Sequence, residues 1–250
     1  MMTDPRDPVP TGTPKVGEPA VCLECEARHR GICGVLSVDE LATLNQISVR
    51  KVYPKGSTLI EMGHVPEFHG NVLQGVVKLS KTLQDGRQQI VGIQFAPDFL
   101  GRVWGEESPV GAESATEVHV CRFPRDVIEH MMSTIHRLEH RVFEQILLQL
   151  DLARDWILTL GQKSATERVA SLLLLIAKHN DPTHNLESRS HNSTFELPLS
   201  RADIADFLGL TLETVSRQVT KLRDLGVIRV ENNRTITVLD QARLVELSGP

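Results

Sequence analysis

The sequence predicts an α+β protein in which an antiparallel, cupin-like β-roll is followed by one long helix and a C-terminal winged helix-turn-helix. Three observations predict this order. Short apolar runs separated by glycines fill the first half of the chain, apolar residues then recur every three or four positions, and two capped helices separated by a glycine come last.

The composition narrows the classes of protein to consider. The 250 residues, 40% of them hydrophobic, suffice for one large core or two moderate ones, which argues against a disordered chain. The formal net charge of −5 excludes a strongly basic coating protein. The longest apolar run, Leu172 to Ala177, is too short to cross a bilayer, and the N-terminus has no signal-peptide pattern. We therefore expect a soluble cytoplasmic protein without membrane contact.

The N-terminal part divides into a tail and the start of a folded domain. Five of the thirteen prolines lie in residues 1–20, which predicts a disordered tail. A domain over 21–123 follows and opens with a cysteine-bearing loop from Cys22 to Cys33. Ser37 and Glu40 then have the spacing of a capping box, which predicts a short helix.

The β-roll is predicted from about residue 49 to residue 123. Runs such as 76–80 and 90–93 are short and apolar, and glycines punctuate the segment. Asp85-Gly86 lies between two such runs and is a hairpin signal. Regular short strands with turn residues between them are typical of an antiparallel roll or barrel.

A long amphipathic helix is predicted over 124–160, with Pro124 at its first position. One interpretation is a helix packed on its own domain. The other is the seam of a homodimer, which we favour because the stripe is longer than the neighbouring roll could cover. The predicted dimerisation residues are Ile135, Leu138, Val142, Ile146, Leu150, Ala153 and Ile157.

The last domain is predicted over 161–250. After a polar, loop-like stretch at 180–193, Ser200 and Thr211 have the composition and spacing of N-caps of two short helices. Gly209 between them supplies the positive φ that a tight turn needs, so the segment has a helix-turn-helix layout. Gln218 stands where an apolar residue is usual, and we expect Val219 to take over that packing.

The outward face of the second helix has the chemistry of a base-reading surface. Glu213 can accept a hydrogen bond from cytosine, and Arg217 can pair with both acceptors of guanine. Lys221 and the hydroxyl groups suit phosphates, and residues 227–238 are predicted to form a two-stranded wing. The predicted DNA-binding residues are Glu213, Thr214, Ser216, Arg217, Thr220 and Lys221.

The charge of this domain bears on how it would bind DNA. Residues 161–250 carry 11 Lys+Arg and 11 Asp+Glu, which argues against tight non-specific binding but not against specific binding. Helix-turn-helix shapes also occur in domains that bind no nucleic acid. We predict binding to double-stranded DNA because the cations concentrate on one helix and the wing.

The four cysteines form the other constellation. Cys22, Cys25 and Cys33 are close together, and Cys121 lies far downstream. Four thiolates suit zinc or an iron–sulfur cluster, and the spacing does not choose between them. Cys121 could instead be a small buried side chain, and Cys22 and Cys25 could be a redox pair, although no thioredoxin-like pattern surrounds them. No Ser/His/Asp or paired-carboxylate arrangement indicates an enzyme.

The order of roll, long helix and winged helix-turn-helix resembles the CRP/FNR family of bacterial transcription regulators. The resemblance covers the chain from Cys22 to about Leu247. Glu213-Thr-Val-Ser216-Arg217 resembles the FNR-type recognition signature E-[TS]-[VI]-S-R, and the cysteine arrangement resembles the oxygen-responsive FNR type, especially its FnrN/FnrL-like members.

The resemblance implies a site and a mechanism. It implies a [4Fe-4S] cluster ligated by Cys22, Cys25, Cys33 and Cys121 that promotes the dimer. It also implies an activator that binds a TTGAT-N4-ATCAA-like palindrome, in which Arg217 would read guanine, Glu213 the cytosine side and Ser216 a thymine. In such proteins oxygen degrades the cluster and the DNA is released. The Asp85-Gly86 loop resembles a region that contacts RNA polymerase.

The same family includes cyclic-nucleotide sensors. Their phosphate-binding segment has a Gly-Glu pair followed by Arg-Ser-Ala. Gly105-Glu106 is present here, but Glu113 stands where the phosphate-pairing arginine would be, and a carboxylate repels a phosphate. We therefore expect no cyclic nucleotide.

Two alternatives to an oxygen sensor remain at this stage. One is a regulator of the same family with a structural zinc or a different effector. The other is an Fe-S redox protein, which we disfavour because no G-x-G-x-x-G motif is present and the helix-turn-helix would be unused.

Overall fold

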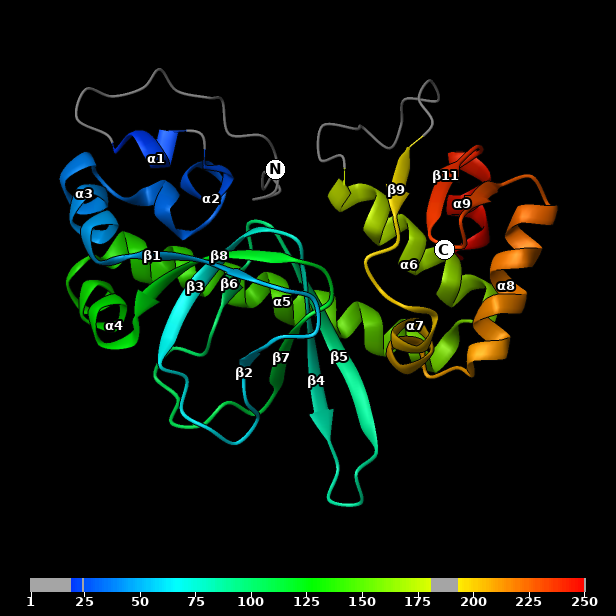
Figure 1. Ribbon diagram of the computed structural model, residues 1–250, viewed down its shortest axis with the longest axis horizontal. Helices are drawn as coiled ribbons and strands as arrows, with labels where there is room; N and C mark the ends of the chain where they lie inside the picture. The colour runs from blue at the N-terminus through cyan, green and yellow to red at the C-terminus, as the bar shows by residue number, and fades with distance from the viewer. Residues whose placement is uncertain (1–18, 24, 181–192, 250) are drawn as a thin grey trace. The chain divides into compact units, whose positions relative to one another are not determined.

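The computed structural model describes residues 19–23, 25–180 and 193–249, which form two compact units (Figure 1). Unit 1 holds the described residues up to Arg87 and residues 91–151; unit 2 holds residues 88–90 and the described residues from Leu152 onward. The predicted tail lies outside the described residues except at positions 19 and 20, as does nearly all of the predicted loop at 180–193.

Two four-stranded sheets form the roll of unit 1. One has the order β1 (Val49–Tyr53), β8 (Val118–Pro124), β3 (Phe68–Gln74) and β6 (Phe99–Leu100), and its neighbouring strands pair antiparallel. The other has the order β2 (Thr58–Ile60), β7 (Gly111–Ser114), β4 (Val76–Thr82) and β5 (Gln88–Phe95). Their inward side chains form a closed apolar core that includes Val72, Val77, Val118 and Val120. The predicted roll is confirmed.

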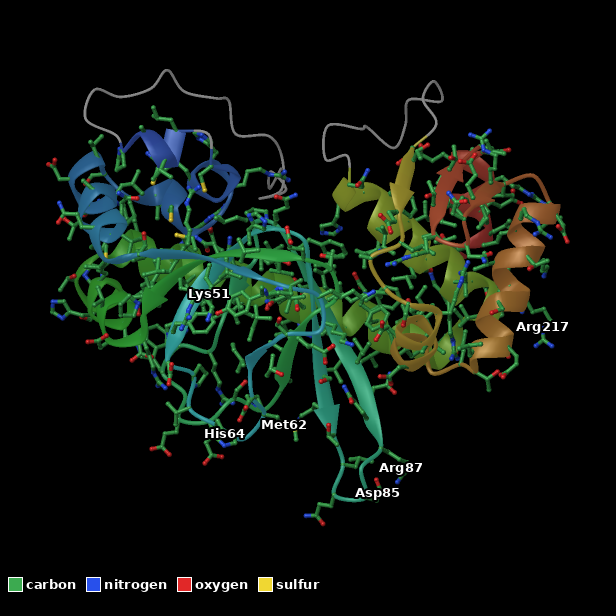
Figure 2. The ribbon with its side chains drawn as sticks, viewed as in Figure 1. Lys51, Met62, His64, Asp85, Arg87 and Arg217 are labelled. Carbon is green, nitrogen blue, oxygen red and sulfur yellow. The ribbon has the colours of Figure 1, made fainter. Side chains whose placement is uncertain are left out.

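The hairpin between β4 and β5 forms at the predicted place. Gly86 has a φ of 85°, which a glycine adopts without strain, and its N–H donates to the carbonyl of Leu83 at 2.9 Å. Asp85 and Arg87 form an ion pair of 2.8 Å at the tip (Figure 2).

The segment before β1 forms short helices, α1 (Ala20–Leu23), α2 (Glu26–His29), the 3-10 helix η1 (Ile32–Val35) and α3 (Val38–Ile47). The predicted capping box is confirmed, because the N–H of Glu40 donates to the Ser37 hydroxyl and the N–H of Ser37 to the Glu40 carboxylate. Ile32, Leu41 and Leu44 are buried here in one core with apolar residues from the helices that follow the roll.

The structure has two helices where the sequence predicts one over 124–160. They are α4 (Arg125–Thr134) and α5 (His136–Gln162), and Ile135 between them has a φ of −114° and a ψ of 84°, outside the helical region. The hydroxyls of Ser133 and Thr134 both donate to the carbonyl of His130 and so compete with the backbone ladder. Such hydrogen bonds weaken and bend a helix, and they lie in the turn at which α4 ends, a feature that the apolar spacing does not reveal.

Unit 2 contains α6 (Ala165–Asn180), β9 (Thr194–Glu196), α7 (Arg201–Leu208), α8 (Leu212–Asp224), β10 (Ile228–Glu231), β11 (Thr235–Val238) and α9 (Gln241–Leu247). The sheet has three strands, in the order β10, β11, β9, rather than the predicted two. Phe195 of β9 is buried and lies opposite Ile236 of β11, so the third strand completes the apolar face of the wing. Within the described part of the chain, no helix is both long and apolar enough to span a membrane.

Candidate functional site

Helices α7 and α8 form the helix-turn-helix. Gly209 ends α7 in the left-handed region with a φ of 60°, and the Thr211 hydroxyl accepts from the N–H of Thr214 at 3.2 Å to begin α8. The inner face of α8 is buried through Val215, Val219 and Leu222.

Gln218 does not belong to that inner face. Val219 is 4% exposed and occupies the core position, as expected. The Gln218 side chain is half-buried and its Oε1 accepts a hydrogen bond of 2.8 Å from the Thr166 hydroxyl on α6. The polar residue therefore joins α8 to the first turn of α6 instead of leaving a gap in the core.

The candidate base-reading side chains lie on the outward face of α8. Glu213, Ser216, Arg217, Thr220 and Lys221 are exposed and Thr214 is half-buried. Figure 2 shows Arg217 projecting outward from α8.

Three of these side chains, Arg217, Glu213 and Lys221, have contacts with neighbouring hydroxyl or backbone groups. The Arg217 guanidinium lies 3.5 Å from the Thr214 hydroxyl. The backbone N–H of Glu213 and the Thr211 hydroxyl lower the pKa of the Glu213 carboxyl, so it is ionised and accepts hydrogen bonds only. Lys221 donates to the Thr166 hydroxyl at 3.2 Å.

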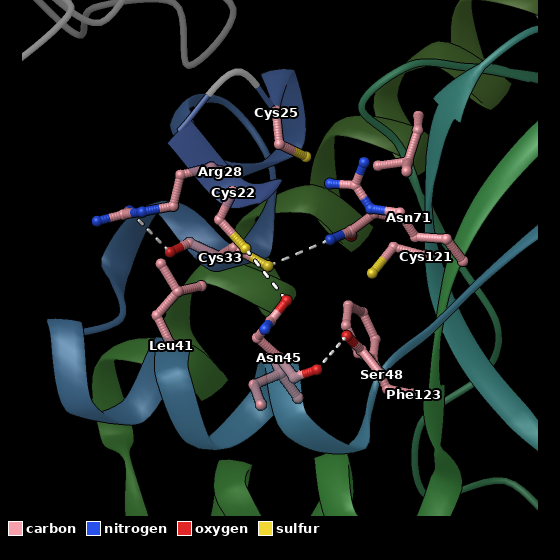
Figure 3. Close-up of a pocket in the computed structure, with 13 residues that line it drawn as sticks. Cys22, Cys25, Arg28, Cys33, Leu41, Asn45, Ser48, Asn71, Cys121 and Phe123 are labelled. Carbon is pink, nitrogen blue, oxygen red and sulfur yellow. Dashed lines mark hydrogen bonds between the residues drawn. The ribbon is translucent and has the colours of Figure 1, made fainter. Parts of the chain in front are cut away.

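All four cysteines line one pocket in unit 1, with an empty volume of about 370 Å³ that includes its part open to solvent (Figure 3). Cys22 lies in α1, Cys25 just before α2, Cys33 in η1 and Cys121 on β8. Cys33 is buried and the other three are half-buried. The fold thus brings the distant cysteine to the three that are close in sequence.

Three polar side chains from outside the cysteine loop contact three of these sulfurs. The Cys22 thiol donates to Asn45 Oδ1 at 3.7 Å, and Asn71 Nδ2 donates to Cys33 Sγ at 3.5 Å (Figure 3). The Ser48 hydroxyl forms a hydrogen bond with Cys121. The sequence does not indicate this set of side chains, apart from Asn71, which is a polar residue inside the buried part of a strand.

The thiols affect each other's ionisation. The pKa of Cys33 is raised far above the usual value of a thiol, first by burial and then by the charges of Cys121, Cys25 and Cys22, while Arg28 acts in the opposite direction. Burial also raises the pKa of Cys121, against the hydrogen bond from Ser48. Cys33 and Cys121 are therefore neutral thiols in the metal-free protein, and a metal centre that binds them as thiolates must displace their protons.

The stability of the metal-free protein should consequently depend on pH. Above about pH 8.5 an unfolded thiol loses its proton while folded Cys33 retains it, so the free energy of unfolding should fall with rising pH, by up to about 1.4 kcal/mol per pH unit for one thiol. Urea unfolding of metal-free wild type and Cys33→Ala between pH 7.5 and 9.5 would measure this. Identical slopes for the two proteins would contradict it.

The four cysteines line the pocket without forming a compact ligand group. Across the described residues 19–23, 25–180 and 193–249, no group of three or more His, Cys, Asp or Glu side chains is arranged to hold a single metal ion.

The predicted dimer seam divides into two parts. Leu138 and Val142 have no exposed surface and Ile135 packs beside them, so these three belong to the core of their own protomer. The N-terminal helices cover these residues, a long-range contact that their apolar spacing in the sequence does not reveal. Ala153 is half-buried. The exposed apolar residues of α5 are Phe143, Ile146, Leu147, Leu150, Ile157 and Leu158.

Ile157 offers a direct test of this face, since it is 71% exposed. A charge there should shift a monomer–dimer equilibrium toward monomer, because burying an unpaired carboxylate is costly. We expect Ile157→Glu to raise the dimer dissociation constant at least tenfold in analytical ultracentrifugation. Asp126→Ser, at an exposed position in the first turn of α4, is the control and should leave the constant unchanged; an equal shift in both variants would exclude this seam.

Comparison with known proteins agrees with this architecture. Residues 167–247 match the family described as Crp-like helix-turn-helix domain, and residues 50–135 match the family described as cyclic nucleotide-binding domain. The chain is 49% identical to a probable transcriptional activator of Rhizobium leguminosarum bv. viciae, over 92% of this chain and 94% of that one. It is 42% identical to the transcriptional activator protein FnrL of Cereibacter sphaeroides, over 91% of this chain and 92% of that one.

Among solved structures, FixK2 of Bradyrhizobium japonicum matches with a TM-score of 0.72 and 29% identity, covering 82% of this chain and 98% of that one. Since close relatives align over nine-tenths of the chain, it belongs to the Crp/FNR family, whose members are transcription regulators rather than enzymes.

Proposed function

We propose that this transcription regulator is an oxygen-responsive activator whose dimer binds a TTGAT-N4-ATCAA-like palindrome when a [4Fe-4S] cluster occupies the cysteine-lined pocket. The observation that carries the proposal is the meeting of Cys22, Cys25, Cys33 and Cys121 around one pocket. The similarity to FnrL and to a probable transcriptional activator supports it.

Four soft thiolates suit an iron–sulfur cluster as well as zinc, and the lack of a compact ligand group among the described residues favours the cluster. Four thiolates that bind one zinc at about 2.3 Å must lie within about 4 Å of one another. In a four-iron cluster each thiolate binds a different iron, so the sulfurs surround a larger group, as they surround this pocket. The bound cluster would supply the oxygen-reactive centre that the chain's own side chains lack.

The chain's contacts suggest how the pocket acts on α5. Arg137 Nε donates to the carbonyl of Val35 at 2.7 Å, and Arg141 donates to the carbonyls of Arg30 and Gly31. These carbonyls belong to the segment that carries Cys25 and Cys33. A cluster that tied the four cysteines together would hold these carbonyls in place for the two arginines, and its loss would leave the cysteine-bearing segment freer to withdraw them from α5.

Dimerisation would in turn decide DNA binding. Two recognition helices must lie about 34 Å apart to reach successive major grooves, which only a dimer provides. Binding both half-sites at once gains affinity that one subunit lacks. Arg217 and Glu213 on α8 are the groups that would read the guanine and the cytosine of each half-site.

A cyclic nucleotide is not part of the proposal. Glu113, at the place of the phosphate-pairing arginine, forms an ion pair of 2.9 Å with Lys78 across β7 and β4. The carboxylate would repel a phosphate, and the nearby Lys78 is already paired with it. Arg125 donates to the carbonyl oxygens of Gly105 and Glu106.

The exposed Asp85-Gly86 turn is the surface we propose for RNA polymerase.

Protein purified without oxygen tests the proposal. We expect four iron and four sulfide ions per chain, broad visible absorption and elution as a dimer, followed by loss of colour and a shift toward monomer after exposure to air. A colourless protein with one zinc per chain and unchanged elution would instead support a structural brace with another effector. An iron-containing protein without affinity for the palindrome would support a redox role.

A further inference from the structure

We infer that Asn71 is a positioning residue for the proposed cluster, holding and polarising the Cys33 ligand through a hydrogen bond from its side-chain amide. The inference rests on the proposed function. Asn71 is fully buried on β3, directly opposite Cys121 of β8 on one side and Phe99 of β6 on the other. It lines the pocket together with the four cysteines.

The amide has a partner at one end only. Its Nδ2 lies 3.5 Å from Cys33 Sγ, and its Oδ1 is buried without a hydrogen-bond partner in the described structure (Figure 3). A buried amide with one unpaired end weakens a fold, and an apolar side chain would suit a strand in which residues 68–72 are all buried. The polar side chain is therefore explained by the sulfur that it faces.

An amide suits this place because it has both a donor and an acceptor. Its oxygen can accept a hydrogen bond from a neutral thiol, and its nitrogen can donate to a thiolate. Cys33 is the deepest of the four cysteines and the one whose thiolate loses the most hydration. A donor fixed in the sheet can replace part of that hydration once the sulfur is a ligand.

The hydrogen bond should affect the reduction potential of the proposed cluster. A donor to a ligand sulfur favours the more negative, reduced form and so raises the reduction potential. The relevant step is the gain of one electron by [4Fe-4S]²⁺ from a chemical reductant, which gives [4Fe-4S]¹⁺ and breaks no bond. Removing the donor should disfavour this reduction.

The test is the near-isosteric variant Asn71→Leu, prepared without oxygen and titrated with dithionite while the reduced cluster is followed by electron paramagnetic resonance. We expect the reduction equilibrium to shift about tenfold toward the oxidised form, which is 59 mV for one electron. We also expect faster loss of the visible absorption in air. Iron and sulfide content before exposure should match the wild type.

Gln94→Leu is the matched control. Gln94 is another buried amide in the same roll, 4% exposed, and it donates to the carbonyl of Phe99 at 2.9 Å without lining the pocket. Its removal should leave the potential unchanged. If Asn71→Leu does not fold, Asn71→Ser, whose hydroxyl is too short to reach Cys33, should show the same shift.

The outcomes separate the two proposals. A wild type without iron overturns the proposed function and this inference with it. A wild type with a cluster, and an unchanged potential in both Asn71 variants, overturns only the role of Asn71. Equal shifts in the Asn71 and Gln94 variants would assign the effect to general disturbance of the roll and would also overturn it.

Discussion

Replacing Cys121 by serine should abolish cluster binding and reduce promoter affinity at least a hundredfold. Serine keeps the volume but offers a harder oxygen ligand, which suits iron–sulfur centres poorly. Cys121 is the one proposed ligand from the roll, so its loss should detach the N-terminal cysteines from β8. The affinity loss follows because avidity between two half-sites is typically worth about 10²–10⁴. Iron analysis and anaerobic fluorescence anisotropy with the palindrome would measure both effects.

His119→Ala is a suitable control for Cys121→Ser. His119 is on the same strand with a 38% exposed side chain, and it pairs with Glu117 rather than with a cysteine. The control should keep both iron and affinity. Full DNA binding by iron-free Cys121→Ser would show that the cluster does not control the dimer.

Replacing Arg217 by alanine should cost about 1–3 kcal/mol of binding to the palindrome and remove most of the preference for guanine at the contacted position. The forked donor of arginine matches the two acceptors of guanine, and alanine leaves both without a protein partner. Competition binding with operators that carry each of the four bases at that position would measure the change.

Arg223→Ala is the matched comparison for Arg217→Ala. Arg223 is in the last turn of α8 and pairs with Asp224 at 2.9 Å. If Arg223 contacts a phosphate, its removal should weaken binding equally for all four operators and reduce the salt dependence of binding. If Arg217→Ala instead gives this uniform loss, Arg217 contacts a phosphate and does not read a base.

Local patterns predicted the fold well because each depends on neighbours in the chain. The capping box at Ser37, the N-cap at Ser200, the turn at Gly86 and the left-handed Gly209 are all found where the sequence places them. The third strand of the wing, β9, was missed because it has only three residues and its partner lies about forty positions away.

The parts that were missed depend on tertiary contacts. Apolar spacing predicts that Leu138 and Val142 are buried, but it does not predict which element covers them. In the structure they are covered by the N-terminal helices. In the same way, the cysteines were evident as a set, while Asn45, Ser48 and Asn71 were not, because polar residues in unrelated elements carry no shared spacing.

The position of β8 restricts how a change at Cys121 can travel. β8 is an interior strand, paired along its length with β1 on one side and β3 on the other. A shift of β8 by one residue relative to β1 and β3 would turn each of its inward side chains outward. The strand therefore cannot transmit a change by sliding along its neighbours. A structural change at Cys121 must therefore be transmitted through the side chains that line the pocket, while the sheet itself stays fixed.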